Sequence, residues 1–222
     1  MTTKADRIPL QRLLSSPGLM ADLSLRIAQG AVGLYPTETI YGLGGRVDKN
    51  GEVARRLHDV KLRPPSNPLI ALAAHRTFFE SLTLDFPQAA IRLADAFWPG
   101  KLTLVLPVEG SADFLAVRTS DHPFITALYS QLTTPIYSTS ANTAGQPYCG
   151  SVDGLWNLFG DKVDFFIDAG ELPMSFPSSI VKVYPDSRIE VLREGVISGE
   201  RIAQALQGDV CQGPALKPAT AQ

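Results

Sequence analysis

Apolar residues recur along this chain in short continuous runs and in runs with helical spacing. The short runs are bounded by Gly, Pro, Asn or Asp, a pattern typical of buried strands. Strands are predicted at residues 31–35, 69–72, 102–108, 115–118, 135–137, 163–167, 179–184 and 189–192, and the stretch 36–50 is predicted to be a loop.

Helical spacing alternates with these runs. Helices are predicted at about residues 17–29, 50–60, 88–98, 123–131, 151–159 and 198–206. Ser16, Asp121 and Ser151 are expected to cap three of them, since short polar side chains accept hydrogen bonds from the first free amides of a helix. Asn50 is expected to cap the helix that buries Val53, Leu57 and Val60, with Lys61 just beyond its end.

Helices and strands intermingle without an internal linker. This order predicts one α/β (α+β) domain over residues 10–207, followed by a flexible tail at 208–222 that is rich in Gly, Pro, Ala and Gln. The strands predicted between 163 and 192 have no helix between them. A twisted sheet with both parallel and antiparallel strands, flanked by helices, is therefore expected.

Composition narrows the class of protein. A chain of 222 residues, 45% hydrophobic and 19% charged, can bury a large single core. Cys149 and Cys211 match neither a metal pair nor a disulfide framework, which favours a reducing compartment. Neither a membrane-spanning apolar run nor a secretory signal is found, so we expect a cytoplasmic protein with no membrane partner.

Charge is unevenly distributed along the chain. The net charge is −2, which disfavours a general nucleic-acid binder. Residues 1–76 hold 11 Lys and Arg against 6 Asp and Glu, whereas residues 77–222 hold 9 against 16. The first third is therefore basic. Phosphate-loop, dinucleotide-fingerprint and nucleophile-elbow motifs are absent from the sequence, so side chains must supply the positive charge of any nucleotide site.

Three polar stretches interrupt the apolar runs. They are Tyr35–Gly44, Lys61–Leu69 and Ser138–Asn142. The second places two cations in a Pro-rich turn, which is unfavourable unless an anion or a carboxylate neutralises them. The third sets hydroxyl groups and an amide directly after an apolar strand. Together these stretches predict a pocket for a polyanion beside a small polar molecule.

Together with Phe97–Leu104, Ala116–Arg118 and Leu192–Gly195, these stretches resemble the YrdC-like threonylcarbamoyl-AMP synthases over roughly residues 20–200. The resemblance implies a YrdC-like fold with a concave basin, in its short, single-domain form. It also implies a nucleotidyltransferase that makes L-threonylcarbamoyladenylate and pyrophosphate from L-threonine, bicarbonate and ATP, for threonylcarbamoyladenosine modification of tRNA.

The resemblance implies two groups of site residues. Lys61 and Arg63 would be catalytic and would hold the triphosphate of ATP; the other nucleotide contacts would be Asn67, Ser140, Asn142 and Arg193. L-Threonine would be bound by Thr37, Tyr41, Arg118, Ser138 and Ser178. Mg²⁺ would accompany ATP through phosphate oxygens and water, because the motifs contain no dedicated carboxylate cage.

Simpler interpretations exist for the same side chains. Lys61 and Arg63 could be surface cations at a helix end, and Arg118 could form a structural ion pair with Asp121. Glu38 is expected to be solvated or to cap a turn, without a role in the site. Leu72 and the segment Phe176–Ser179 depart from patterns common in the family, at positions that concern threonine.

The resemblance also implies partners and alternatives. A separate tRNA-modifying transferase complex would receive the unstable product. One alternative is an RNA-binding module that uses the basin of the fold, with weak RNA affinity that falls steeply as salt is raised. Another is a paralogue with a different acyl donor, such as carbamoyl phosphate.

Overall fold

The computed structural model describes residues 4–48, 50–62, 69–143, 145–146, 148–173 and 176–207. The strands are β1 Asp6–Pro9, β2 Gly33–Tyr35, β3 Gly42–Arg46, β4 Ile70–Ala73, β5 Leu102–Pro107, β6 Phe114–Thr119, β7 Ile136–Ser140, β8 Phe165–Asp168, β9 Ser179–Val183 and β10 Ile189–Arg193. The helices are α1 Leu10–Leu14, α2 Pro17–Ala28, α3 Glu52–Lys61, η1 Arg76–Leu82 (3₁₀), α4 Gln88–Phe97, α5 Pro123–Leu128, α6 Val152–Phe159 and α7 Gly199–Leu206. The predictions on Arg63, Asn67, Cys211 and the tail at 208–222 fall outside the described residues.

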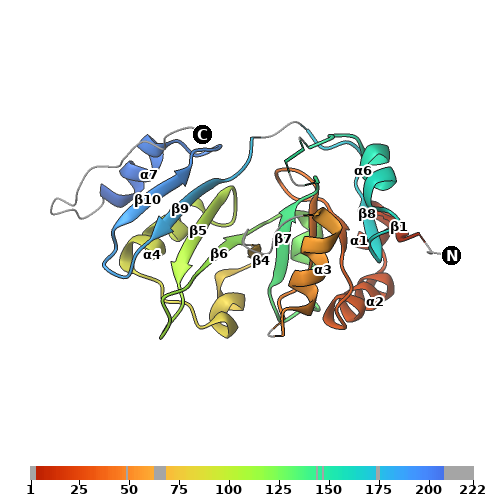
Figure 1. Cartoon of the computed structure of the whole chain (residues 1–222), viewed down its shortest axis with the longest axis horizontal. Helices are drawn as coiled ribbons and strands as arrows, with labels where there is room; N and C mark the ends of the chain where they lie inside the picture. The colour runs from red at the N-terminus through yellow and green to blue at the C-terminus, as the bar shows by residue number, and fades with distance from the viewer. Residues whose placement is uncertain are drawn as a thin grey trace.

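Within the described residues, ten strands form one sheet that runs through the molecule (Figure 1). Their order is β1-β8-β2-β3-β7-β4-β6-β5-β9-β10. The pairs β1–β8, β2–β8, β4–β6 and β5–β9 are parallel, and the other neighbours are antiparallel. The predicted mixed sheet flanked by helices is therefore confirmed.

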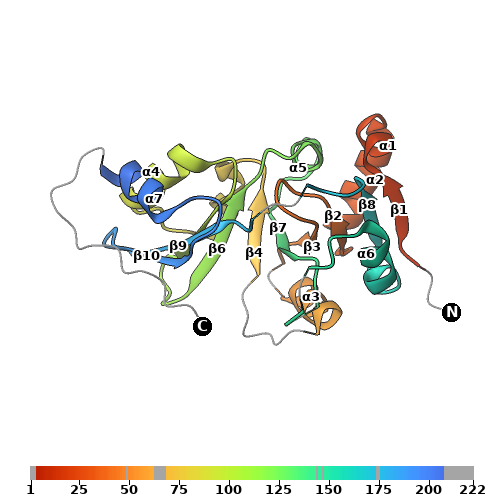
Figure 2. The ribbon, with the colours of Figure 1, turned by 90° about the horizontal axis from the view of Figure 1, so that it is seen from above.

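The two faces of the sheet are covered unequally. Successive side chains of β8 lie on opposite faces of the sheet, since Phe165 and Ile167 belong to one core and Phe166 belongs to the other. The first core is built against α1, α2, α4, α5 and α7, whereas among the described helices only α3 and α6 contribute to the second. Figure 2 shows α1, α4 and α5 on one side of the sheet and α3 and α6 on the other.

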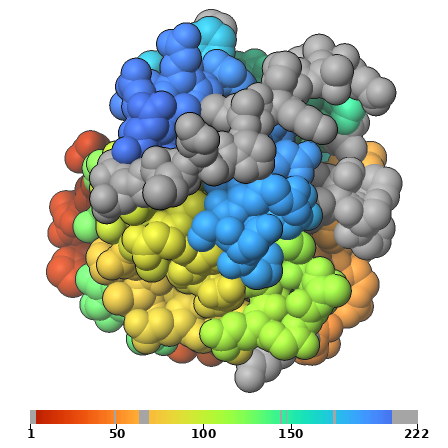
Figure 3. All heavy atoms as spheres, turned by 90° about the vertical axis from the view of Figure 1, so that its left-hand side faces the viewer, coloured from red at the N-terminus to blue at the C-terminus, as the bar shows by residue number. Residues whose placement is uncertain are grey.

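Strands β5, β6, β9 and β10 supply no residue to the second core. Along β5, Leu102, Leu104 and Leu106 are fully buried in the first core, so the residues between them face the opposite side. At this end of the molecule, the surfaces of β9, β10 and α7 adjoin those of α4 and β5 (Figure 3). The uncovered half of the second face is the floor of the candidate site.

Several local predictions were wrong. Strand β3 lies inside the predicted loop 36–50, because its Gly-rich sequence has little strand propensity and its pairing with β7 is long-range. A Cβ on Gly44 would lie 1.9 Å from the carbonyl oxygen of Tyr137, so the close approach of the two strands requires glycine there. Strand β7 continues through Ser138 to Ser140, so the hydroxyl cluster lies within the strand rather than after it.

The helix ends match more closely. Ser16 and Ser151 cap α2 and α6 as predicted, each accepting a hydrogen bond from a backbone N–H of the first turn. At α5 the cap is His122, whose Nδ1 accepts from the backbone N–H of Phe124, instead of Asp121. Helix α3 includes Lys61 as its last residue. Its N-cap position is Gly51, but Oδ1 of Asn50 accepts from the first-turn N–H of Glu52 at 3.4 Å, so the predicted cap is present one residue earlier. Strand β1, helix α1 and η1 were not predicted.

Candidate active site

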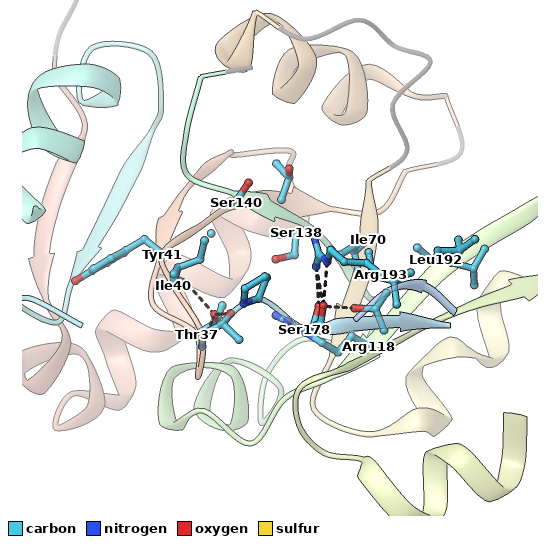
Figure 4. A pocket seen from close by; sticks show the side chains of 18 residues that line it. Thr37, Ile40, Tyr41, Ile70, Arg118, Ser138, Ser140, Ser178, Leu192 and Arg193 are labelled. Carbon is cyan, nitrogen blue, oxygen red and sulfur yellow. Dashed lines mark hydrogen bonds between the residues drawn. The ribbon is translucent and has the colours of Figure 1, made fainter. Parts of the chain in front are cut away.

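A cavity of about 360 Å³ lies over the uncovered half of the sheet (Figure 4). Its lining comes from the loop before β3 and the first residue of that strand, from Pro177 and Ser178 just before β9, and from strands β4, β5, β6, β7, β9 and β10. The polar side chains of the lining include Thr37, Thr39, Thr103, Arg118, Ser138, Thr139, Ser140, Ser178 and Arg193. The rest of the lining is largely apolar and includes Ile40, Ile70, Val105, Ala116, Ile180 and Leu192. A mostly apolar cavity with a few convergent polar groups is typical of a small-molecule site.

Two arginines converge on one side of this cavity. Arg118 of β6 is 6% exposed, and Arg193 of β10 lies at the more open rim. The guanidinium of Arg193 donates from Nε and Nη2 to the carbonyl oxygen of Ser178, at 3.1 and 2.8 Å. Partial burial of the Arg193 guanidinium and the nearby charge of Arg118 lower the pKa of Arg193. Two neighbouring cations in a concave site favour an anionic ligand.

Hydroxyl groups surround the arginine pair. Ser138 and Ser140 are two residues apart on β7, so their side chains leave the same face of the strand. Ser178 Oγ lies 3.0 Å from Thr103 Oγ1. Thr37 donates to the carbonyl oxygen of Ile40 at 2.7 Å, and its Oγ1 accepts from the backbone N–H of Thr39 at 3.2 Å and lies 2.9 Å from Oγ1 of Thr39. The hydroxyl of Thr37 is therefore bonded within the loop, and a ligand would have to replace one of these partners.

Lys61 belongs to a second group that meets the cavity at Ser140. Its side chain is not a surface cation, because Lys61 is only 2% exposed. Its ammonium donates to the carbonyl oxygen of Ser140 and, at 3.1 Å, to Oδ1 of Asn142. The hydroxyl of Ser140 also donates to Asn142. Segments about 80 residues apart in sequence thus place a cation, a hydroxyl and an amide side by side.

Tyr41 forms part of the cavity wall, but its hydroxyl points away from the cavity (Figure 4). The hydroxyl donates to the carbonyl oxygen of Gly170 at 2.9 Å and accepts from the N–H of Ala169 at 2.7 Å. Burial raises the pKa of Tyr41 to about 12, so the phenol is neutral at physiological pH. Any contact between Tyr41 and a ligand is therefore made by its backbone or the edge of its ring.

Glu38 was expected to be solvated, and this expectation was wrong. Its side chain is 14% exposed, and its Oε1 lies 3.6 Å from Nη2 of Arg118. The hydroxyl of Ser120 donates to its Oε2. Arg118 is therefore paired with Glu38 and not with Asp121. The one signal in the sequence was the position of Glu38 beside Thr37, in the first polar stretch.

The structure also bears on metals and membranes. Among the residues that the structure describes, no three His, Cys, Asp or Glu side chains form a cluster that could hold a metal ion. No helix in the same part of the chain has the length and apolar character needed to cross a membrane.

Comparison with known proteins gives one family. The family model Sua5_yciO_yrdC, described as "Telomere recombination", matches residues 26–195. Threonylcarbamoyl-AMP synthase of Vibrio vulnificus (strain YJ016) is 34% identical over 183 residues, which cover 76% of this chain and 94% of that protein. The protein of the same name from Bacillus subtilis (strain 168) is 31% identical over 192 residues, which cover 82% of this chain. The match spans only 55% of the Bacillus protein.

A solved structure agrees with the sequence matches. The crystal structure of P. abyssi Sua5 complexed with L-threonine aligns with a TM-score of 0.78 and 30% sequence identity. The alignment covers 92% of this chain and 61% of that chain.

Proposed function

The chain belongs to the Sua5/YciO/YrdC family, as its motifs predicted, and from that premise we propose that it makes L-threonylcarbamoyladenylate and pyrophosphate from L-threonine, bicarbonate and ATP. The observation that carries the proposal is the pair Arg118 and Arg193 among hydroxyls, in a cavity adjoining buried Lys61. Support comes from relatives named threonylcarbamoyl-AMP synthase and from the Sua5 complex with L-threonine. In this proposal residues 10–207 form the catalytic unit.

We assign the threonine side of the cavity to Arg118 and its neighbours. The guanidinium of Arg118 would hold the carboxylate of the amino acid, for which a planar fork is well suited. The hydroxyls of Ser138 and Ser178 can donate to or accept from the substrate, whereas Thr37 would contact it by exchanging one of its bonds within the loop. Tyr41 would contribute a wall. A volume of about 360 Å³ accommodates an amino acid together with the reacting end of a nucleotide.

We assign the nucleotide side to the group around Lys61. Its ammonium, already directed at Ser140 and Asn142, would hold phosphate oxygens near β7. Arg63 and Asn67, outside the described residues, are proposed to complete this wall. Arg193 lines the same cavity as Ser140 and lies near Arg118, and we keep it as a contact to the adenylate because the new bond must form where the two substrates meet.

The proposed reaction has two steps. The amine of threonine attacks the carbon of bicarbonate, and loss of water gives the N-carboxylate. An oxygen of this N-carboxylate then attacks the α-phosphorus of ATP. The bond from that phosphorus to the oxygen that bridges it to the β-phosphorus breaks, and pyrophosphate leaves with the bonding electrons. Lys61 and the two arginines would stabilise the negative charge that develops on the leaving group and at the reacting phosphorus. The chemistry requires no covalent nucleophile.

Mg²⁺ is proposed to enter as part of the ATP complex, because oxygen ligands from phosphates and water satisfy its octahedral preference. The proposal places the enzyme in the cytoplasm. Transfer of the product to a tRNA-modifying complex and weak direct binding of RNA stay predictions from the family resemblance.

Pyrophosphate release tests the function directly. The purified chain is incubated with ATP and Mg²⁺, and L-threonine and bicarbonate are omitted in turn. We expect release that requires both compounds and that stops when L-threonine is replaced by L-valine, which lacks the hydroxyl. Release supported equally by carbamoyl phosphate would favour the alternative acyl donor. Release that is indifferent to threonine would contradict the proposal.

A further inference from the structure

Arg118 has a charge partner that is not part of the cavity lining. Oε1 of Glu38 lies 3.6 Å from Nη2 of Arg118, which is too long for an ordinary hydrogen bond but close enough for strong attraction between two largely buried charges. Neither this Oε1 nor Nε of Arg118 has a hydrogen-bond partner among the described residues. Glu38 therefore balances the charge of Arg118 while leaving guanidinium N–H groups for a ligand.

Glu38 is held in place from the side away from Arg118. The hydroxyl of Ser120, which is fully buried, donates to Oε2 of Glu38 and accepts from the backbone N–H of His122 at 3.2 Å. Ser120 directly follows β6, the strand that carries Arg118. The carboxylate and the guanidinium are thus positioned by the same strand, so their relative geometry is set by the fold.

This arrangement determines the charge that a ligand meets. Among the described residues that line the cavity, the charged side chains are Arg118 and Arg193, and both are cations. Counting Glu38 behind them, the local net charge is +1 rather than +2. An amino acid is a zwitterion, so its ammonium is repelled by both arginines, and a buried carboxylate nearby reduces that repulsion. A simple anion has no ammonium and would bind better without Glu38.

We infer that Glu38 is a positioning residue that, through Arg118, makes the cavity prefer a zwitterionic amino acid to an anion lacking an ammonium group. This inference rests on the proposed function, which identifies the amino acid as threonine. It gives a role to a buried carboxylate that the chemistry above does not use.

Selectivity measured by calorimetry tests the inference. L-Threonine and 3-hydroxybutyrate, which keeps the carboxylate and the hydroxyl but lacks the ammonium, are titrated into the wild type, Glu38→Gln and Glu38→Asp. We expect Glu38→Gln to weaken threonine binding roughly tenfold and to strengthen 3-hydroxybutyrate binding several-fold. Glu38→Asp keeps the charge and should retain most of the wild-type preference.

The ratio of the two affinities separates this role from a structural one. Damage to the fold would weaken both ligands together and leave the ratio unchanged, and that result would overturn the inference. Asp164→Asn is the matched control, because Asp164 is also a partly buried, ion-paired carboxylate, bonded to Arg56 at 2.7 Å, but it does not line the cavity. Its ratio should equal that of the wild type.

A sulfate titration keeps this test independent of the proposed function. If the wild type binds no threonine, the proposed function fails, and sulfate then decides the role of Glu38. An affinity for sulfate that is roughly fivefold higher or more in Glu38→Gln than in the wild type would support the inference, because a cavity of higher positive charge favours a dianion. Equal sulfate affinities would overturn it.

Discussion

Replacement of Arg118 by Gln should remove most of the affinity for L-threonine. Arg118 is the most deeply buried charged group of the lining, and Glu38 leaves its N–H groups available to a carboxylate. A hydrogen bond to a charged group contributes about 1.5–3 kcal/mol. Loss of about 2 kcal/mol corresponds to roughly 30-fold weaker binding, since 1.36 kcal/mol is about tenfold. Isothermal calorimetry with L-threonine measures this directly.

The same substitution has a second effect that needs a control. Arg118→Gln leaves the carboxylate of Glu38 buried without its cation, which should lower the free energy of unfolding by up to about 3 kcal/mol. The double variant Arg118→Gln/Glu38→Gln removes that buried charge, so urea denaturation should show stability recovered while threonine binding stays weak. Threonine affinity within about threefold of the wild type in Arg118→Gln, or restored in the double variant, would refute the assignment of Arg118 to the carboxylate.

Three further predictions concern the nucleotide side, the sheet and pH. Lys61→Ala should reduce pyrophosphate release roughly 100-fold or more, because it removes a buried cation from the proposed phosphate site. The control Lys162→Ala, at an exposed helix end, should leave the rate unchanged. Equal rates in the two variants would contradict the role of Lys61. Gly44→Ala should lower the free energy of unfolding by about 3 kcal/mol or more in urea denaturation, because the new Cβ would lie 1.9 Å from a backbone oxygen. In the control Gly18→Ala in α2, no atom lies within 4 Å of the new Cβ, so stability should change by about 1 kcal/mol or less. Similar losses in both variants would count against the register of β3. Burial lowers the pKa of His122 below its ordinary value of 6.5, so near pH 6 the unfolded chain binds more protons than the folded one. The free energy of unfolding should therefore fall as the pH decreases below 6.5. His122→Asn, which keeps a helix cap that does not titrate, should flatten this dependence on pH, and an unchanged slope would contradict the prediction.

Much of the fold could be predicted because local sequence signals agreed with tertiary packing. Helix caps such as Ser16 and Ser151 and the apolar run at 102–108 are short-range patterns, and the structure has the two caps and strand β5 where they were predicted. Strand β3 could not be predicted, because a Gly-rich segment becomes a strand only through contacts with β7, about 95 residues later in the chain. His122 caps α5 in place of Asp121, since the backbone geometry at this turn presents the imidazole nitrogen to the free amide.

The candidate site shows the same division. The polar stretches indicated Ser138 and Lys61, and the family resemblance indicated Arg118. The structure places Arg118 and Ser138 in one cavity and Lys61 against Ser140 at its rim. The role of Glu38 was not visible in the sequence, because its partners Arg118 and Ser120 lie 80 or more residues away and are brought to it only by the sheet. Residue type and spacing can indicate a site, but they do not show which charges will be buried together.

In the proposed function, the cavity over β5, β6, β7 and β9 binds the amino-acid substrate. A crystal structure of this chain with L-threonine would locate the substrate. We expect the carboxylate of threonine on the guanidinium of Arg118, with its hydroxyl and amine among Thr37, Ser138 and Ser178. Threonine bound elsewhere on the molecule, with Arg118 contacting only Glu38, would contradict it.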